Sequence, residues 1–223
     1  MGTLYIVSTP IGNLEDITFR AISTLRTVDY ILCEDTRITG KLLTRYSINK
    51  KMVSITDFNE ESKIPPILND LISGKNIALV SDAGTPLISD PGFKLVREAI
   101  KNGICVESIP GPTAAIAALT VSGLPTDKFL FLGYLPKKGG KRLKILENLK
   151  SSQDLIKFTA VIYESPFRLL KTLSAIKEIF GDVNIVICRE LTKLHEETRR
   201  EKISESIRHF SRIEPKGEFT IVV

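Results

Sequence analysis

Residues 77–92, Ile77-Ala-Leu-Val-Ser-Asp-Ala-Gly-Thr-Pro-Leu-Ile-Ser-Asp-Pro-Gly92, decide the fold class of this chain. The apolar run 77–80 is typical of a strand that is buried on both faces of a parallel sheet, and a long polar loop follows it. In open α/β sheets, ligands bind at the carboxyl ends of the strands. We therefore predict that a ligand-binding loop begins at Asp82.

Two carboxylates of this loop receive different interpretations. Because Gly84 permits close approach to the backbone, we favour ligand contact for Asp82 over a role as a plain turn residue. Asp90 precedes Pro91 and fits better as a turn or cap residue at the start of a helix. The apolar positions of that amphipathic helix are Phe93, Leu95, Val96, Ala99 and Ile100.

The composition describes an ordinary globular protein. The 223 residues, 43% hydrophobic and 26% charged, suit one large domain or two small ones. No apolar run approaches the roughly twenty residues that span a bilayer, and no signal peptide is evident, so we expect a cytoplasmic protein with no membrane contact. A net charge of +5 suits a polyanionic partner such as RNA, although many proteins without such a partner share this excess.

The cysteines and histidines argue against a metal site. Cys33, Cys105 and Cys188 fall in predicted strands without paired spacing, so we expect buried thiols and neither disulfides nor zinc ligands. His195 and His209 are too few for a histidine-rich metal site. His195 also lies in a charged stretch, which favours a solvated residue over a catalytic base.

The whole chain alternates strands and helices, which predicts an α/β protein. We expect two α/β domains, residues 1–115 and 116–223, with a mostly parallel sheet in the first and a mixed sheet in the second. The predicted strands are 4–7, 30–33, 53–55, 77–80, 105–109, 129–132, 159–163, 184–188 and 219–223. Besides the helix after Asp90, the predicted helices are 18–25, capped by Asp16, and 39–46, 64–73, 114–119, 143–149, 168–180 and 203–210.

Motifs that are absent exclude several common sites. The chain has no G-x-G-x-x-G after its first strand, no G-x-x-x-x-G-K-[ST] and no G-x-S-x-G, which argues against dinucleotide, P-loop and α/β-hydrolase chemistry. Polar loops nevertheless occur in both halves, which indicates a ligand crevice between the two domains. These loops are residues 8–13, 82–86, 110–115, 163–166 and 189–193.

Several segments carry a resemblance to a known family. They are residues 4–18, 33–37, 77–92, 110–114, 163–166 and 189–196. Together they resemble the small-subunit ribosomal RNA 2′-O-methyltransferase I family, which belongs to the tetrapyrrole methylase, or class III, S-adenosylmethionine-dependent enzymes. The resemblance implies a tetrapyrrole methylase-like fold, S-adenosyl-L-methionine bound in a cleft between the domains, and a homodimer. It also implies the substrate, the ribose 2′-hydroxyl of a decoding-centre cytidine in 16S rRNA of the 30S subunit.

The resemblance also assigns donor contacts and shows departures. Phe167 stands where the family often has histidine, and Ser8 where it often has proline or alanine. Many members continue beyond the position of Val223 into a small helical extension. The implied cofactor-binding residues are Pro10, Ile11, Asp82, Ala83, Gly84, Thr85, Thr113, Ala114, Tyr163, Glu190 and Glu218.

Methyl transfer to a hydroxyl needs alignment and an acceptor for the hydroxyl proton. Glu34, Asp35, Glu190 and Lys193 are the candidates, and we place Glu190 and Lys193 first because they follow a strand that faces the expected cleft. The alternative is that Asp35, Arg37, Glu190 and Lys193 form ion pairs only. The expected substrate RNA contacts, partly in the basic loop 136–142, are Glu34, Asp35, Arg37, Lys137, Lys138, Lys141 and Arg142.

Two other functions stay open on the sequence. One is a class III methyltransferase that acts on a small tetrapyrrole or another small molecule. The other is a non-catalytic RNA-binding module on the same fold, which would keep salt-sensitive RNA affinity without binding the methyl donor.

Overall fold

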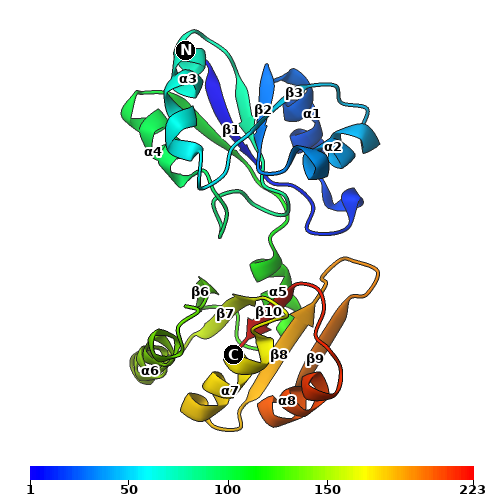
Figure 1. The fold of residues 1–223 in the computed structure, drawn as a ribbon, viewed down its shortest axis with the longest axis vertical. Helices are drawn as coiled ribbons and strands as arrows, with labels where there is room; N and C mark the ends of the chain where they lie inside the picture. The colour runs from blue at the N-terminus through cyan, green and yellow to red at the C-terminus, as the bar shows by residue number, and fades with distance from the viewer. The chain divides into compact units, whose positions relative to one another are not determined.

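The computed structural model describes residues 1–223 as two compact units, Met1–Thr113 and Ala114–Val223 (Figure 1). Each unit has one five-stranded sheet with helices packed on it. This arrangement confirms the predicted α/β fold class. None of the helices combines the length and the apolar content that crossing a bilayer requires.

The first unit is built on a fully parallel sheet, in the order β3-β2-β4-β1-β5. Strand β4, which the opening apolar run predicts, lies between β1 and β2 and is buried throughout. Its loop therefore starts at the middle of the sheet. The strands are β1 (Thr3–Val7), β2 (Tyr30–Cys33), β3 (Lys51–Ser54), β4 (Ile77–Leu79) and β5 (Cys105–Ile109).

Helices cover both faces of this sheet (Figure 1). Neighbouring residues of a strand point to opposite faces, so Leu79 joins one apolar core and Ala78 the other. The helices α3 (Glu60–Ile72) and α4 (Phe93–Lys101) pack on the Leu79 side. The helices α1 (Phe19–Thr27) and α2 (Thr36–Arg45) pack on the Ala78 side.

The first turns of α1 and α2 differ from the sequence-based expectation. Thr18, and not Asp16, caps α1, because its hydroxyl accepts a hydrogen bond from the Ala21 amide at 3.1 Å. Asp16 instead ends a 3₁₀ helix, η1 (Leu14–Asp16). Helix α2 starts earlier than predicted, because the Asp35 carboxylate caps it. A capping side chain therefore decides both starts.

The second unit has a mixed sheet in the order β6-β7-β10-β8-β9, in which only β6 and β7 run parallel. Its main core lies between the sheet and α6, α7 and α8, whereas α5 packs against β10 and β7. The strands are β6 (Phe129–Tyr134), β7 (Thr159–Glu164), β8 (Asn184–Arg189), β9 (Glu197–Lys202) and β10 (Phe219–Val222). The helices are α5 (Ala114–Ser122), α6 (Gly139–Leu155), α7 (Leu169–Phe180) and α8 (Ile203–Arg212).

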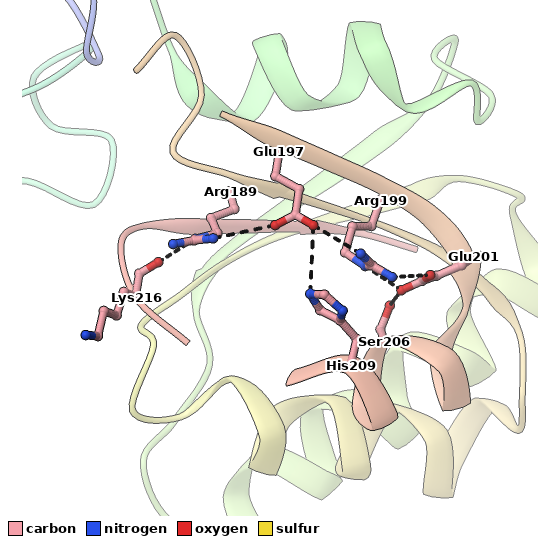
Figure 2. Close-up of polar contacts among 7 residues, drawn as sticks. All are labelled: Arg189, Glu197, Arg199, Glu201, Ser206, His209 and Lys216. Carbon is pink, nitrogen blue, oxygen red and sulfur yellow. Dashed lines mark hydrogen bonds and ion pairs between the residues drawn. The ribbon is translucent and has the colours of Figure 1, made fainter. Parts of the chain in front are cut away.

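Strand β9 was not predicted, because its sequence Glu-Thr-Arg-Arg-Glu-Lys has no apolar alternation. Its alternate side chains form an ionic network instead (Figure 2). The Arg199 guanidinium donates to both Glu201 carboxylate oxygens at 2.8 Å and to Glu197 at 3.1 Å. The Ser206 hydroxyl of α8 donates to Glu201 at 2.7 Å. Ion pairs within the strand and the Ser206 hydrogen bond to α8 thus satisfy side chains that in other strands make apolar contacts.

The cysteines are only partly as expected. All three lie in strands, and Cys33 and Cys188 are buried. Cys105 is exposed, because it begins β5 at the edge of the first sheet. The expectation of a buried thiol is therefore wrong for Cys105.

We expect Gly92→Ala to destabilise the first unit more than Gly103→Ala. Both glycines have positive φ, 121° and 70°, so alanine at either position costs about 1–2 kcal/mol of backbone strain. A Cβ at Gly92 would also lie 2.5 Å from the Leu79 Cδ2 atom, whereas a Cβ at Gly103 meets nothing within 4 Å. Such overpacking adds about 1–3 kcal/mol. Urea unfolding of the two variants measures the difference, and equal losses would contradict the close contact.

Candidate functional site

The loops after β1 and β4 are joined at the carboxyl edge of the first sheet. The Thr9 amide donates to the Gly84 carbonyl at 2.9 Å, and the Gly84 amide donates to the Thr9 carbonyl at 3.0 Å. The Thr9 hydroxyl adds a bond to the Ser81 carbonyl at 3.1 Å. Gly84 has a φ of 82°, which glycine adopts at little cost. The two predicted ligand loops 8–13 and 82–86 therefore form one connected structure.

A third predicted loop, residues 110–113, is attached to the same place. The Thr85 hydroxyl donates to the Pro112 carbonyl at 3.1 Å, which leaves the Ser8 hydroxyl to donate to Thr85 Oγ1 at 3.0 Å. A Cβ at Gly111 would lie 2.8 Å from the Ser8 Cβ, so the two chains pass very close together. Ser8 thus supplies a hydrogen bond that proline or alanine at this position would not supply.

Asp82 connects this edge to the loop after β2. Its Oδ1 atom accepts a hydrogen bond from the Asp35 amide at 3.0 Å. The Asp35 carboxylate pairs with Arg37 at 2.5 Å, and this hydrogen bonding lowers the pKa of Asp35 to about 2. Glu34 also faces Asp82, since the charge of Asp82 helps burial to raise the pKa of Glu34. The structure therefore brings the predicted residues of both loops together.

Asp90 belongs to the same acidic group, which the sequence interpretation missed. Burial first, and then the charge of Glu34, raises the pKa of Asp90 to about 7. The expectation that Asp90 caps a helix is wrong: Gly92 is the N-cap of α4, and Glu60 accepts the Leu95 amide at 2.9 Å. Burial also raises the pKa of Asp82. Carboxylates that resist ionisation in this way would be stabilised by a bound cation.

A second cluster lies in the second unit. The Lys193 ammonium contacts Glu190 Oε1 at 2.9 Å and Glu218 Oε2 at 2.7 Å, and the Glu218 amide donates to Glu190 Oε1 at 2.9 Å. Burial acts to raise the pKa of Glu190, but the hydrogen bonds from Lys193 and Glu218 bring it below its ordinary value. Burial acts to lower the pKa of Lys193, but hydrogen bonds to Glu218 and Glu190 raise it. Lys193 is therefore held protonated.

The structure shows which of the four candidate residues Asp35, Arg37, Glu190 and Lys193 form ion pairs. Within the first unit Asp35 pairs with Arg37, and within the second Lys193 pairs with Glu190 and Glu218. The pairing that the sequence left open is thus present as two separate groups. In the second unit it continues into the β9 network, because Arg189, next to Glu190, contacts the Glu197 carboxylate at 3.6 Å (Figure 2).

Tyr163 supports the start of α5. Its hydroxyl oxygen accepts a hydrogen bond from the Ala115 amide at 3.0 Å, and its ring packs edge-to-face on Phe131 at a centroid distance of 4.8 Å. Ala114 is the first residue of α5, and Thr113 is the last residue of the first unit. The Tyr163 ring is therefore fixed in place, whereas the Phe167 side chain is exposed.

The predicted basic loop 136–142 is largely helical. Helix α6 begins at Gly139, so the expectation of a loop is wrong from that residue onward. Lys137, Lys138 and Lys141 are exposed, as a phosphate contact requires. Arg142 differs from them, because only 9% of it is exposed. Its burial could not be seen in the sequence, where it reads as one more basic residue.

Comparison with known proteins shows which family the chain belongs to. The profile described as Tetrapyrrole (Corrin/Porphyrin) Methylases matches residues 3–206. A relative from Thermotoga maritima is 52% identical over 223 residues, covering 100% of this chain and 98% of the relative. A relative from Halalkalibacterium halodurans is 50% identical over 222 residues, covering 100% and 75%. Both are named ribosomal RNA small subunit methyltransferase I. The chain belongs to this family of rRNA methyltransferases.

Solved structures agree on the fold of this rRNA methyltransferase. Uroporphyrin-III-C-methyltransferase from Thermus thermophilus has a TM-score of 0.66 at 19% identity, covering 100% of this chain and 94% of that one. The cobalt precorrin-4 methyltransferase has a TM-score of 0.73 at 17% identity, covering 99% and 94%. At such identities the likeness shows the fold alone. The resemblance predicted from the sequence is thereby confirmed for both family and fold.

We expect the methyltransferase to lose stability between about pH 4 and pH 7 through Asp90. The folded-state pKa is about 7, above the unfolded value of about 3.9, so within this range the folded protein binds more protons than the unfolded chain. Raising the pH then favours unfolding until Asp90 is ionised in both states. Asp90→Asn should flatten this part of the profile of melting temperature against pH, and the exposed Asp127→Asn should not. Equal slopes in wild type and Asp90→Asn would contradict the assignment.

Proposed function

We propose that the protein transfers the methyl group of S-adenosyl-L-methionine to the ribose 2′-hydroxyl of a cytidine in the decoding centre of 16S rRNA. The observation that carries this proposal is the 52% identity, over the whole chain, to a protein named ribosomal RNA small subunit methyltransferase I. The motifs that resemble the 2′-O-methyltransferases give the finer assignment of atom and nucleotide. The substrate is then naked 16S rRNA or the 30S subunit.

The carboxyl edge of the first sheet fits the donor. When bound, the donor supplies a methyl group on a positively charged sulfur, and it also carries an ammonium group. Burial, and then repulsion from neighbouring carboxylates, raises the pKa values of Glu34, Asp82 and Asp90, so a cation beside them would stabilise their ionised forms. The proposed donor contacts are Pro10, Ile11, Asp82, Ala83, Gly84, Thr85, Thr113, Ala114, Tyr163, Glu190 and Glu218.

The proton acceptor is proposed from the Glu190 cluster. Lys193 cannot accept a proton while two carboxylates hold it in its charged form. Glu190 is ionised and can accept one, although its lowered pKa makes it a weak base. Lys193 then acts as a positioning residue that fixes the Glu190 carboxylate.

Other expectations remain predictions. They are the cleft between the two domains as the place of the donor, the homodimer and the cytoplasmic location. The exposed Lys137, Lys138 and Lys141 are proposed RNA phosphate contacts, because clustered cations release counterions from a polyanion. Glu34, Asp35 and Arg37 are proposed to lie near the RNA ribose or phosphate.

We expect Asp82→Asn to weaken donor binding about 10- to 100-fold, the usual effect of losing a hydrogen bond to a charged group. The asparagine Oδ1 atom can still accept the Asp35 amide, so the loop should keep its conformation while the negative charge is lost. Isothermal titration calorimetry with S-adenosyl-L-methionine measures the change. The exposed Asp154→Asn is the matched control, and unchanged affinity in Asp82→Asn would remove Asp82 from the donor site.

The whole proposal is tested by supplying donor with a labelled methyl group. Purified protein is incubated with 30S subunits, with naked 16S rRNA and with a tetrapyrrole, and the label is then mapped. We expect label on one cytidine ribose of the decoding centre. Label on a base, on the tetrapyrrole, or on nothing would overturn the proposed reaction.

A catalytic arm of the same experiment uses Glu190→Gln. A general base is typically worth about 10²- to 10⁴-fold, so single-turnover methyl transfer at saturating donor should slow by that factor. Lys193→Met should also slow it, because the Glu190 carboxylate loses the contact that positions it. An unchanged rate in Glu190→Gln would leave the cluster with a structural role only.

A further inference from the structure

Arg142 is a buried charge without a partner. It lies in the first turns of α6, is 9% exposed, and has an enclosed Nε atom with no hydrogen-bond partner. Its guanidinium forms no ion pair with any carboxylate of the chain. A buried N–H donor without a partner costs about 1–3 kcal/mol, so such groups are normally satisfied. The unpaired state therefore points to an acceptor that comes from outside the chain.

A cavity lies where this acceptor would bind. It has a volume of about 350 Å³ and opens between α6 and α7. Besides Arg142, the polar residues that line it are Lys171, Ser174 and, as the one acidic residue, Glu178. We call it the α6–α7 cavity. An ammonium, a guanidinium and a hydroxyl around a space of this size are the donors that bind a phosphate group.

The start of α6 adds backbone donors to the α6–α7 cavity. Gly139 lines the cavity, and the N-cap residue Lys138 makes no side-chain hydrogen bond to the first turn. A Cβ at Gly139 or Gly140 would meet nothing within 4 Å, and neither residue has a positive φ. Packing and backbone conformation therefore do not require these glycines. Their effect is to leave the N–H groups of the helix start open to an anion.

We propose that the α6–α7 cavity binds a backbone phosphate of the RNA substrate, with Arg142 as its buried ligand. This inference rests on the proposed action on rRNA and extends it from a charged surface to an open cavity with named lining residues. The exposed Lys137, Lys138 and Lys141 next to it attract the strand, whereas Arg142 fixes one phosphate in position. A planar guanidinium that binds two phosphate oxygens gives this position direction as well as charge.

A substitution of Glu178 distinguishes phosphate binding by Arg142 from an ion pair between Arg142 and Glu178. Its carboxylate lines the same cavity but forms no ion pair with Arg142, so it repels a bound phosphate more than it neutralises the arginine. If the cavity binds phosphate, Glu178→Gln should tighten RNA binding. If Arg142 instead pairs with Glu178 in solution, Glu178→Gln should destabilise the fold and leave RNA binding unchanged.

The test measures fluorescence anisotropy of a labelled single-stranded oligocytidylate over a series of potassium chloride concentrations, with the full-length chain. Arg142→Gln should weaken binding about 10- to 100-fold and reduce the salt slope by about one. Arg212→Gln, an exposed arginine at the end of α8, is the matched control and should weaken binding much less. Wild-type affinity and slope in Arg142→Gln would overturn the proposal.

A second arm separates RNA phosphate from free phosphate. Inorganic phosphate should raise the melting temperature of the wild type relative to chloride at equal ionic strength, should do so less in Arg142→Gln, and should compete with the oligonucleotide. Phosphate stabilisation without any effect of Arg142→Gln on RNA binding would overturn the assignment to RNA. If Arg142→Gln does not fold, the Glu178→Gln affinity and the phosphate competition decide the matter.

Donor binding distinguishes this inference from the proposed function. If the wild type methylates 30S subunits while Arg142→Gln binds RNA normally, only the phosphate site is rejected. If RNA binding depends on Arg142 but the wild type neither binds S-adenosyl-L-methionine nor methylates rRNA, the proposed enzymatic function is rejected and the phosphate site remains.

Discussion

The reciprocal pair of hydrogen bonds between Thr9 and Gly84 is the contact on which the candidate donor site depends. β1 and β4 are neighbours and run parallel, so their loops leave the sheet at the same edge. Two free loops there would lose much conformational entropy when a ligand orders them. The two Thr9–Gly84 hydrogen bonds order both loops when the protein folds, so ligand binding does not have to order them. Asp82 is then already beside Asp35 before any ligand binds.

The second unit orders its polar site by charge and not by a backbone bridge. Glu190 and Glu218 share Lys193, and the neighbouring Arg189 connects the same loops to Glu197 of β9 (Figure 2). Such pairs are partly exposed and therefore individually weak, but several of them share one strand. Their combined effect is to fix the edge strand β9 and the turn that carries Glu190.

The sequence predicts the parts of this protein that depend on local apolar pattern. The bounds of strand β2 agree with the predicted range 30–33, because a buried parallel strand shows as a short continuous apolar run. The apolar pattern does not predict strand β9, because its residues are mostly charged and pair with one another and with Ser206 in place of apolar contacts. The buried state of Arg142 likewise depends on α7, which follows a whole strand later. The polar loops were recognised, but their hydrogen bonds could not be.

The acidic group around Asp82 and the basic group at the start of α6 each have the charge opposite to that of the substrate proposed for it. The donor is a cation, and the residues around Asp82 form an acidic group in which Arg37 is occupied by Asp35. RNA is a polyanion, and the start of α6 offers cations without nearby ion pairs, of which Arg142 is buried. Had each set been neutralised internally, neither would gain from its ligand, because a satisfied ion pair has no free charge to offer. Charge left unpaired in the free protein is therefore the observation that supports both proposed sites, which differ in sign.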